Sequence, residues 1–343
     1  MTGAATPLEL SRDAVLAHRR RAGALDARLP AGAESLRRAA WAGLTDSMPR
    51  AALLSIHARV RDTGPDAWED PALVQVWGPR FSAYVVPSDD WAPFTLGRMP
   101  DDVAGRRRAV ETADRLEAFL AGRTMTYSEA GRGMGHNPNS LRYATTTGRV
   151  LIRWDGARRP TVRMVAAPDV DPLDARLELA RRYLHVLGPG TASGFSNWAG
   201  IRPPRARATI DALAARGELV AVRTPIGDGW VLAADEPSFR AKPDAPAAAR
   251  LLPSGDAFYL LHGAARELLV ADPRWRGELW TSRVWPGAVL VGGDVAGTWR
   301  RGGGDVAITA WRTLSPAERA AVEAEAASLP LPDLTGPIRV TWG

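Results

Sequence analysis

An order of elements that occurs twice constrains the fold of this chain most: three short helices are followed each time by two strands. In the first copy, residues 113–122, 125–134 and 137–148 have helical patterns, and a glycine ends the last of them. Residues 149–165 alternate apolar and polar side chains on either side of Asp155-Gly156, a dipeptide typical of tight turns. They therefore predict a hairpin.

The second copy follows directly. Residues 174–187 predict a strong helix, residues 193–200 a short one, and residues 203–216 a third, with prolines at its start and a glycine after its end. Residues 218–233 predict another hairpin around a Gly-Asp-Gly turn. Three helices followed by a hairpin is the pattern of a winged helix, in which the third helix and the hairpin, called the wing, contact DNA.

The two ends of the chain extend this organisation. The first hundred residues fit a looser copy of the pattern, with a strand pair at 73–87. Beyond a linker rich in proline and alanine, residues 287–311 predict a β-meander, and residues 315–329 predict a helix that Ser315 caps. The sequence therefore predicts an α+β fold of three tandem winged-helix domains and a C-terminal β-rich domain. The expected bounds are 1–100, 101–170, 171–240 and 250–343.

The basic charge is concentrated in the first complete copy. The chain has 44 basic and 38 acidic residues, a net charge of +6, and Lys242 is its only lysine. Residues 132–163 contain seven arginines and one acidic residue, Asp155. This segment therefore carries as much excess positive charge as the whole chain. The planar guanidinium fork suits phosphate, which favours nucleic acid as the partner, although GC-rich coding alone also raises arginine content.

The composition excludes several classes of site. The chain has no cysteine, which excludes disulfides, thiol catalysis and thiolate metal sites. No two of its five histidines have the spacing of metal ligands on one helix, so we expect neither a metal nor a cofactor. No apolar run reaches the length of a membrane span and no signal-like leader is present. We expect a cytoplasmic, nucleoid-associated monomer with no membrane partner.

Residues 41–60 form a loop that turns into an amphipathic helix. Three small polar residues, Thr45, Asp46 and Ser47, directly precede this helix. Such residues are the usual N-caps, so Asp46 or Ser47 is expected to accept a hydrogen bond from the first free amides. The alternative is that these groups point at a substrate.

Two further segments complete a family resemblance. RLLPSGDAFYLL at 250–261 and VLVGGDVAGTWRR at 289–301, together with the order of elements, resemble the AlkZ/YcaQ-like family of bacterial tandem winged-helix proteins, which includes alkylpurine DNA glycosylases. The resemblance runs from about Leu8 to the C-terminus. It implies three winged helices and a C-terminal β-rich domain around a concave, basic channel for duplex DNA.

The resemblance also points to a site. In that family the N-terminal winged helix carries a Gln-aliphatic-Gln or Gln-aliphatic-Asp motif directly before a proline-containing helix. Thr45, Asp46 and Ser47 occupy those three positions here. The usual register would send Asp46 towards the core, where an unpaired carboxylate is costly. A shift of one residue would instead turn it into the channel.

The implied chemistry is hydrolysis of an N-glycosidic bond. Cleavage builds positive charge on the sugar, which a carboxylate near C1′ stabilises while it orients or deprotonates water. An N7- or N3-alkylated purine is already cationic and leaves without a general acid. Asp46 would be the base or electrostatic stabiliser, ionised at pH 7 if exposed with an ordinary pKa. Thr45 and Ser47 would position water, and the lack of a nearby lysine argues against a Schiff-base step.

Arginines are expected to hold the DNA backbone, which supplies affinity and salt dependence rather than sequence choice. The expected contacts are Arg50 ahead of the first helix, Arg142 on the third helix of the middle repeat, Arg153, Arg158 and Arg159 on its wing, and Arg202 and Arg205 at the start of the last recognition helix. Any single one of them is as often a solubilising surface charge. His18 and its basic neighbours are expected on a solvated face, and Arg59 is equally compatible with one.

Two classes of function remain. The first is a monofunctional DNA glycosylase, a DNA repair hydrolase that removes alkylated purines from damaged double-stranded DNA and leaves an abasic site. The alternative is a non-catalytic winged-helix DNA-binding protein or regulator with a degenerated site. A third hypothesis is a structure-specific binder of damaged DNA or an RNA-binding module. Release of base from alkylated duplex discriminates the first from the others.

Overall fold

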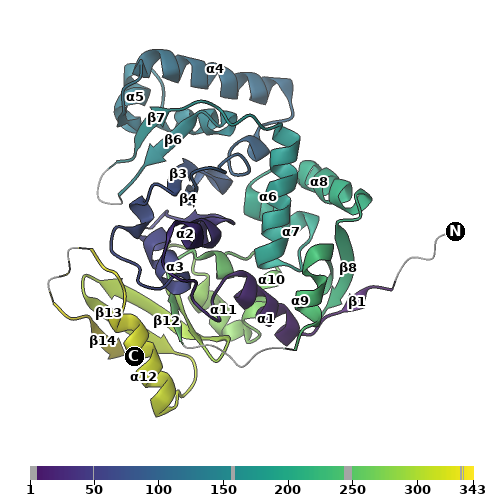
Figure 1. The fold of residues 1–343 in the computed structure, drawn as a ribbon, viewed down its shortest axis with the longest axis vertical. Helices are drawn as coiled ribbons and strands as arrows, with labels where there is room; N and C mark the ends of the chain where they lie inside the picture. Colours follow the sequence, from purple (N-terminus) through teal and green to yellow (C-terminus); the bar gives the residue numbers. More distant parts are fainter. Residues whose placement is uncertain (1–5, 49, 156–158, 243–248, 333, 335) are drawn as a thin grey trace.

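The computed structural model describes residues 6–48, 50–155, 159–242, 249–332, 334 and 336–343, and its strands form three sheets. Figure 1 places α4 (Val103–Leu120) at one end of the molecule and α12 (Pro316–Ala327) at the other. Helix α6 (Pro172–Leu187) lies near the middle, beside the central strands. The chain therefore has a mixed α/β fold.

The middle repeat has the expected order of elements. Helix α4 begins earlier than the sequence pattern indicated, because the Asp102 side chain accepts from the amide of Gly105 and caps it there. The other elements are β5 (Met125–Thr126), α5 (Tyr127–Gly133), η4 (Pro138–Thr147), β6 (Val150–Arg153) and β7 (Thr161–Met164). The hairpin prediction is confirmed by the pairing of β6 with β7.

The third helix of this repeat differs from the prediction. Residues 138–147 form a 3₁₀ helix, η4, and not an α-helix. The hydroxyls of Thr146 and Thr147 donate to the carbonyls of Tyr143 and Ala144, three residues back, at 3.0 and 2.7 Å. Such local side-chain bonds compete with regular helical pairing, which explains the tighter winding.

One six-stranded sheet contains strands of both the first and the middle repeat. Its order is β2-β4-β3-β6-β7-β5, and its first strands are β2 (Leu44–Thr45), β3 (Leu73–Trp77) and β4 (Ala83–Pro87). The antiparallel pairing of β3 with β4 confirms the predicted strand pair. Strand β3 also pairs with β6, where Gln75 lies opposite Ile152. The sheet therefore brings the loop after β2 close to the wing of the middle repeat.

The third repeat also has the expected order. Its elements are α6, α7 (Ala192–Ala199), α8 (Pro203–Ala215), β8 (Leu219–Thr224) and β9 (Gly227–Leu232). Strand β1 (Leu8–Glu9), from the start of the chain, pairs in parallel with β8, and the five-residue helix α9 (Glu236–Arg240) follows the wing.

The prediction of a solvated face for His18 and its neighbours is wrong. Helix α1 (Arg12–Ala22) buries His18 and Arg19 to 1% exposure each. The Arg19 guanidinium donates to the carbonyls of Leu187 and Gly188 at 2.7 and 2.9 Å. Because these carbonyls lie at the C-terminal end of α6, a buried cation there is stabilised by groups that the helix leaves unpaired.

The C-terminal part contains a five-stranded sheet in the order β10-β11-β12-β13-β14. Its strands are β10 (Arg250–Leu252), β11 (Gly287–Val291), β12 (Asp294–Gly302), β13 (Asp305–Ala310) and β14 (Arg339–Trp342). The predicted meander is confirmed by antiparallel β11, β12 and β13. Ser315 caps α12 in a capping box with Glu318, as the sequence predicted.

Helix α3 (Ala51–Arg59) packs directly against this C-terminal part. Leu54 of α3 belongs to the same apolar cluster as Leu251 and Trp299. Arg59 is 3% exposed and forms two hydrogen bonds with the Asp256 carboxylate, at 2.7 and 2.8 Å. The Arg59 side chain is therefore buried in an ion pair that joins α3 to the C-terminal part, and it is not solvated. Among the described residues, no helix combines the length and apolar character needed to cross a membrane.

Candidate active site

Asp46 lies in the loop between β2 and α3. Its backbone amide donates to the carbonyl of Ala83 on β4 at 2.8 Å, which fixes the loop against the sheet. The side chain is 4% exposed. Its Oδ1 accepts from the amide of Ala52 at 3.1 Å, and its Oδ2 accepts from the side-chain amide of Gln75 at 2.7 Å. Arg50 occupies the N-cap position of α3, but its side chain does not accept a hydrogen bond from the helix. Asp46, four residues earlier, supplies the acceptor for a free amide of the first turn instead.

The expectation of an exposed Asp46 with an ordinary pKa is wrong. Burial disfavours the charged carboxylate and raises the pKa of Asp46 to about 6. The bond from Ala52, the charges of Arg50 and Arg153, and the bond from Gln75 act in the opposite direction and limit the rise. Because the pKa stays below 7, the carboxylate is mainly ionised at neutral pH.

Gln75 is a member of this site that the sequence reasoning missed. It is 5% exposed on β3, and it is the only glutamine of the chain. Its Oε1 accepts from the amide of Trp154 at 2.6 Å, and its Nε2 donates to the carbonyl of Trp154 at 3.1 Å as well as to Asp46. One signal could have identified it: a lone amide inside the otherwise apolar strand Leu73–Trp77.

Two arginines stack on one tryptophan beside Asp46. The guanidinium carbons of Arg50 and Arg153 lie 4.7 and 4.2 Å from the ring centroid of Trp68, which is 3% exposed. Arg153 also pairs with Glu69 at 2.6 Å. Arg301 of β12 is close enough for the charge of Arg50 to lower its pKa, after the larger effect of burial. Arg50 and Arg153, from two parts of the chain, are therefore the cations that act on the carboxylate, and Arg301 lies near Arg50.

The side chains of Thr45 and Ser47 lie in different surroundings from that of Asp46. Thr45 is 7% exposed, and its hydroxyl donates to the carbonyl of Gly255 at 2.8 Å, so it contacts the C-terminal part. Ser47 is exposed. Of the three adjacent polar residues, Asp46 is the one whose side chain reaches the middle wing through Gln75.

A separate cleft contains the arginines of the last recognition helix. It measures about 1010 Å³ and lies between α4, η4 and α8, with Arg108, Tyr143, Arg202 and Arg205 among its lining. Arg205 pairs with Asp101, whereas Arg202 is exposed. The structure therefore does not bring Arg202 and Arg205 into the group around Asp46.

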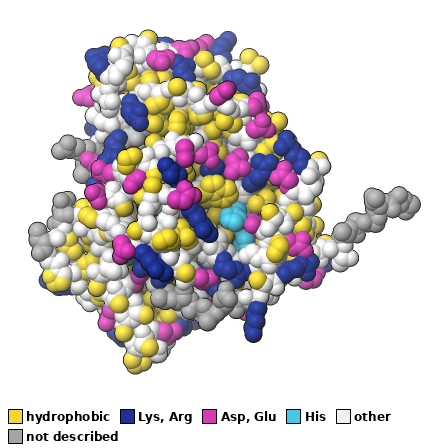
Figure 2. Space-filling model, in the orientation of Figure 1, with side chains coloured by type: hydrophobic (Ala, Val, Ile, Leu, Met, Phe, Trp, Pro, Cys, Tyr) yellow, Lys and Arg dark blue, Asp and Glu magenta, His cyan; other side chains and the backbone are white. Residues whose placement is uncertain are grey.

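The remaining arginines of the predicted DNA interface are dispersed. Arg142 is half-buried and lies 5.8 Å from the ring centroid of Trp77. Arg159 is exposed near the wing, and Arg158 lies outside the described residues. On the face seen in Figure 2, basic side chains alternate with acidic ones and do not gather into one patch. Of the predicted DNA contacts, Arg50 and Arg153 come together near Asp46, and Arg202 and Arg205 line the separate cleft.

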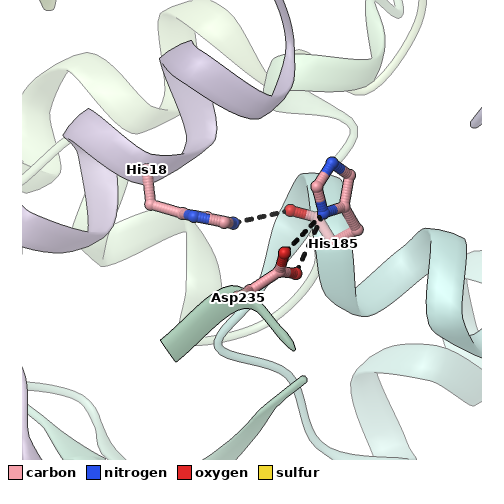
Figure 3. Close-up of side chains that lie close together, drawn as sticks. All are labelled: His18, His185 and Asp235. Atoms are coloured by element: carbon pink, nitrogen blue, oxygen red, sulfur yellow. Dashed lines mark hydrogen bonds and ion pairs between the residues drawn. The ribbon is translucent and has the colours of Figure 1, made fainter. Parts of the chain in front are cut away.

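One other cluster contains residue types that bind metals. His18, His185 and Asp235 offer ligand atoms within 4.8 Å of one another (Figure 3). Both nitrogens of the His18 ring already have partners, the carbonyl of His185 at 2.8 Å and the hydroxyl of Ser238 at 3.0 Å. The Nδ1 of His185 lies 2.9 Å from both oxygens of Asp235. Hydrogen bonds explain this geometry, and they hold α1 against α6 and the start of α9.

Comparisons with known proteins identify the family and a solved structure with a similar fold. A family model described as "DNA glycosylase AlkZ-like" matches residues 36–330. Among solved structures, the Streptomyces sahachiroi DNA glycosylase AlkZ superposes with a TM-score of 0.76 at 17% sequence identity, over 98% of this chain and 100% of that chain. No curated protein matches the chain. At this low identity, the superposition shows a shared fold.

Proposed function

Because the chain belongs to the AlkZ-like DNA glycosylase family, we propose that it hydrolyses the N-glycosidic bond of cationic N7- or N3-alkylated purines in duplex DNA and leaves an abasic site. The observation that carries this proposal is the Asp46 carboxylate, held by two hydrogen bonds beside Arg50 and Arg153. A fixed carboxylate stabilises positive charge that develops on the sugar, and guanidinium groups beside it suit the phosphates of DNA.

Asp46 would act on the sugar and on water. Each carboxylate oxygen accepts one described hydrogen bond, so in this proposal binding of DNA would open the 4% exposed side chain and let an oxygen accept from water or face the developing charge at C1′. The leaving purine is already cationic, so the chemistry needs no general acid. Ser47, which is exposed, would position the attacking water, whereas Thr45, whose hydroxyl already donates to Gly255, would contact that water as an acceptor only.

The same proposal assigns the DNA contacts and the domains. Arg50 and Arg153 would hold phosphates next to the lesion. Arg142, Arg158, Arg159, Arg202 and Arg205 would contact the backbone further along the duplex. The proposal also includes a monomer of three tandem winged helices, at 1–100, 101–170 and 171–240, with a C-terminal β-rich domain at 250–343.

The test is base release from duplex DNA that carries N7-methylguanine or N3-methyladenine, measured by chromatography of the free base and by alkali-labile strand breaks. Asp46→Asn should reduce release by about 100-fold or more, because the variant keeps the shape of the side chain but removes its charge. Asp66→Asn, an exposed aspartate of the same part of the chain, is the matched control and should retain full activity. Equal rates for both variants would exclude Asp46 from the chemistry.

A second function, DNA binding without catalysis, is favoured by the burial of Asp46. A 4% exposed carboxylate whose two oxygens already accept hydrogen bonds also suits a purely structural cap of α3. In that case the protein binds alkylated and unmodified duplex equally well, with affinity that falls steeply as salt rises, and releases no base.

A further inference from the structure

Gln75 connects two parts of the molecule that are distant in sequence. Its side chain forms three hydrogen bonds, one with Asp46 and two with the backbone of Trp154, at 2.6 to 3.1 Å. The wing is the hairpin of β6 and β7, and Trp154 directly follows β6, at the end of that strand from which the chain continues to β7. The side-chain amide of Gln75 therefore pairs with the wing as a neighbouring strand would, and its remaining N–H reaches the carboxylate.

We propose that Gln75 is a positioning residue that fixes the orientation of the Asp46 carboxylate relative to the wing, so that contact between wing and DNA and alignment of Asp46 depend on each other. This inference rests on the proposed function and deepens it. Contact between the wing and a correctly bound duplex would then affect the orientation of the Asp46 carboxylate through the Gln75 side chain.

The chemistry of the amide explains why glutamine occupies this position. The pairing with Trp154 needs an acceptor for its N–H and a donor for its C=O, and Asp46 needs a second donor. Glutamine supplies one acceptor and two donors, which matches these three partners. Glutamate would place a second carboxylate against Asp46, and an apolar side chain would leave buried polar groups of Trp154 and Asp46 unpaired.

The charged groups that face Asp46 come from few elements. Arg50 lies in its own loop, and Arg153 lies on β6 and pairs with Glu69. The adjacent segments of α3 and β4 contribute the backbone groups of Ala52 and Ala83. Gln75 is the neutral partner among them, so its replacement by another neutral residue changes hydrogen bonding without changing charge.

The experiment compares Gln75→Met with Thr145→Val in the full-length protein. Methionine is similar in length to glutamine but cannot form the three hydrogen bonds. Thr145 is fully buried and donates to the carbonyl of Trp77 on the same strand, so its variant also loses a buried hydrogen bond but does not touch Asp46. Base release, the pH profile of kcat, KM for alkylated duplex and hydrogen exchange at the Trp154 amide are measured for both.

We expect Gln75→Met to reduce kcat by about 10- to 100-fold, the loss that corresponds to one hydrogen bond to a charged group. KM should stay within about threefold, since the arginine contacts remain. The acidic limb of the kcat profile should move to higher pH, because the lost donor stabilised the ionised carboxylate. Exchange at the Trp154 amide should become faster, whereas Thr145→Val should change none of these quantities.

The outcomes separate this inference from the proposed function. If the wild type releases base and Gln75→Met matches it in kcat and pH profile, the positioning role is wrong and the glycosylase proposal stands. If the wild type releases no base, the proposed function is wrong, and the pKa of Asp46 is then followed by carboxyl-carbon NMR, assigned with Asp46→Asn. A pKa that is unchanged by Gln75→Met would overturn the coupling in that case too.

Discussion

At the scale of single residues, burial gives Asp46 both a raised pKa and a cost in stability. The folded protein keeps Asp46 protonated up to a pH of about 6, whereas the unfolded chain releases that proton near the ordinary aspartate value of about 3.9. Between these values the native state binds more protons than the unfolded state, so this group lowers the free energy of unfolding as pH rises.

Asp46→Asn should therefore gain stability relative to the wild type as pH rises from 4 to 6, with the difference constant above about 7. The stability difference between the two proteins should change by about 2–3 kcal/mol over this range. The hydrogen bond that asparagine cannot accept from Gln75 lowers the stability of the variant by the same amount at every pH and leaves this change unaltered. Urea unfolding at a series of pH values measures it. A difference independent of pH would show that the carboxylate does not carry the raised pKa.

At Asp256, in contrast to Asp46, the partners of the carboxylate outweigh the effect of burial on its pKa. Burial alone would favour the neutral acid, but the charge of Arg59 and hydrogen bonds from Arg59, Ser55 and the amide of Phe258 outweigh it and lower the pKa of Asp256. Its contribution to stability is therefore present above the ordinary aspartate pKa and is lost as pH falls through the lower, folded value.

Asp256→Ala should reduce the free energy of unfolding by about 3–5 kcal/mol at neutral pH, because it leaves the buried Arg59 charge without its partner. Ser55→Ala removes one hydrogen bond to the same carboxylate and should cost only about 1–2 kcal/mol. Denaturant titration of both variants tests this order, and similar losses for the two would contradict a buried ion pair.

At the scale of elements, the proposed function predicts that the middle wing contacts a DNA phosphate through Arg153 of β6. Arg153→Ala should weaken binding to duplex DNA and should reduce the slope of log affinity against log salt by about 0.9, the value for one lost phosphate contact. Arg115→Ala, on the exposed surface of α4, changes the net charge equally and is the control. Identical slopes for the two variants would place the DNA away from the wing.

The elements themselves were predictable, but the contacts of the site were not. Periodicity and turn residues located the hairpins, α12 and its Ser315 cap, because those features depend on neighbouring residues. The partners of Asp46 depend on strand pairing over 29 residues to Gln75 and then 79 more to Trp154. The sequence left the place of Arg59 open, because its partner Asp256 lies 197 residues away. Nothing local specifies such pairs.

At the scale of the whole molecule, the repeats are held together by buried polar ties as well as by apolar packing. Arg28 donates to both oxygens of Glu325 on α12, at 2.7 and 2.8 Å, which connects the start of the chain to its last helix. Beside it, the Nε2 of His57 lies 3.0 Å from the hydroxyl of Ser328. His18 joins α1 to α6 in the same way (Figure 3). Both histidines therefore sit at junctions between distant segments.

These junctions should make the molecule sensitive to acid. Burial lowers the pKa of His18 and of His57 to about 4, from an ordinary value near 6.5. Between pH 4 and 6.5 the unfolded chain binds protons that the folded protein excludes, so the free energy of unfolding should rise with pH across this window and level off above it. Each histidine contributes up to about 3 kcal/mol.

Replacement of the histidines by glutamine separates their contribution, which raises the free energy of unfolding as pH rises, from that of Asp46, which lowers it. His57→Gln should weaken the rise of unfolding free energy between pH 4 and 6.5, and the double variant with His18→Gln should weaken it further. The two steps should be similar, because the two histidines have no common partner among the residues that the structure describes. The measurement is urea unfolding at each pH. Suppose that both variants kept the wild-type slope of unfolding free energy against pH. The protons that the folded protein excludes would then belong to groups other than His18 and His57, and packing alone would stabilise the contacts around the two histidines.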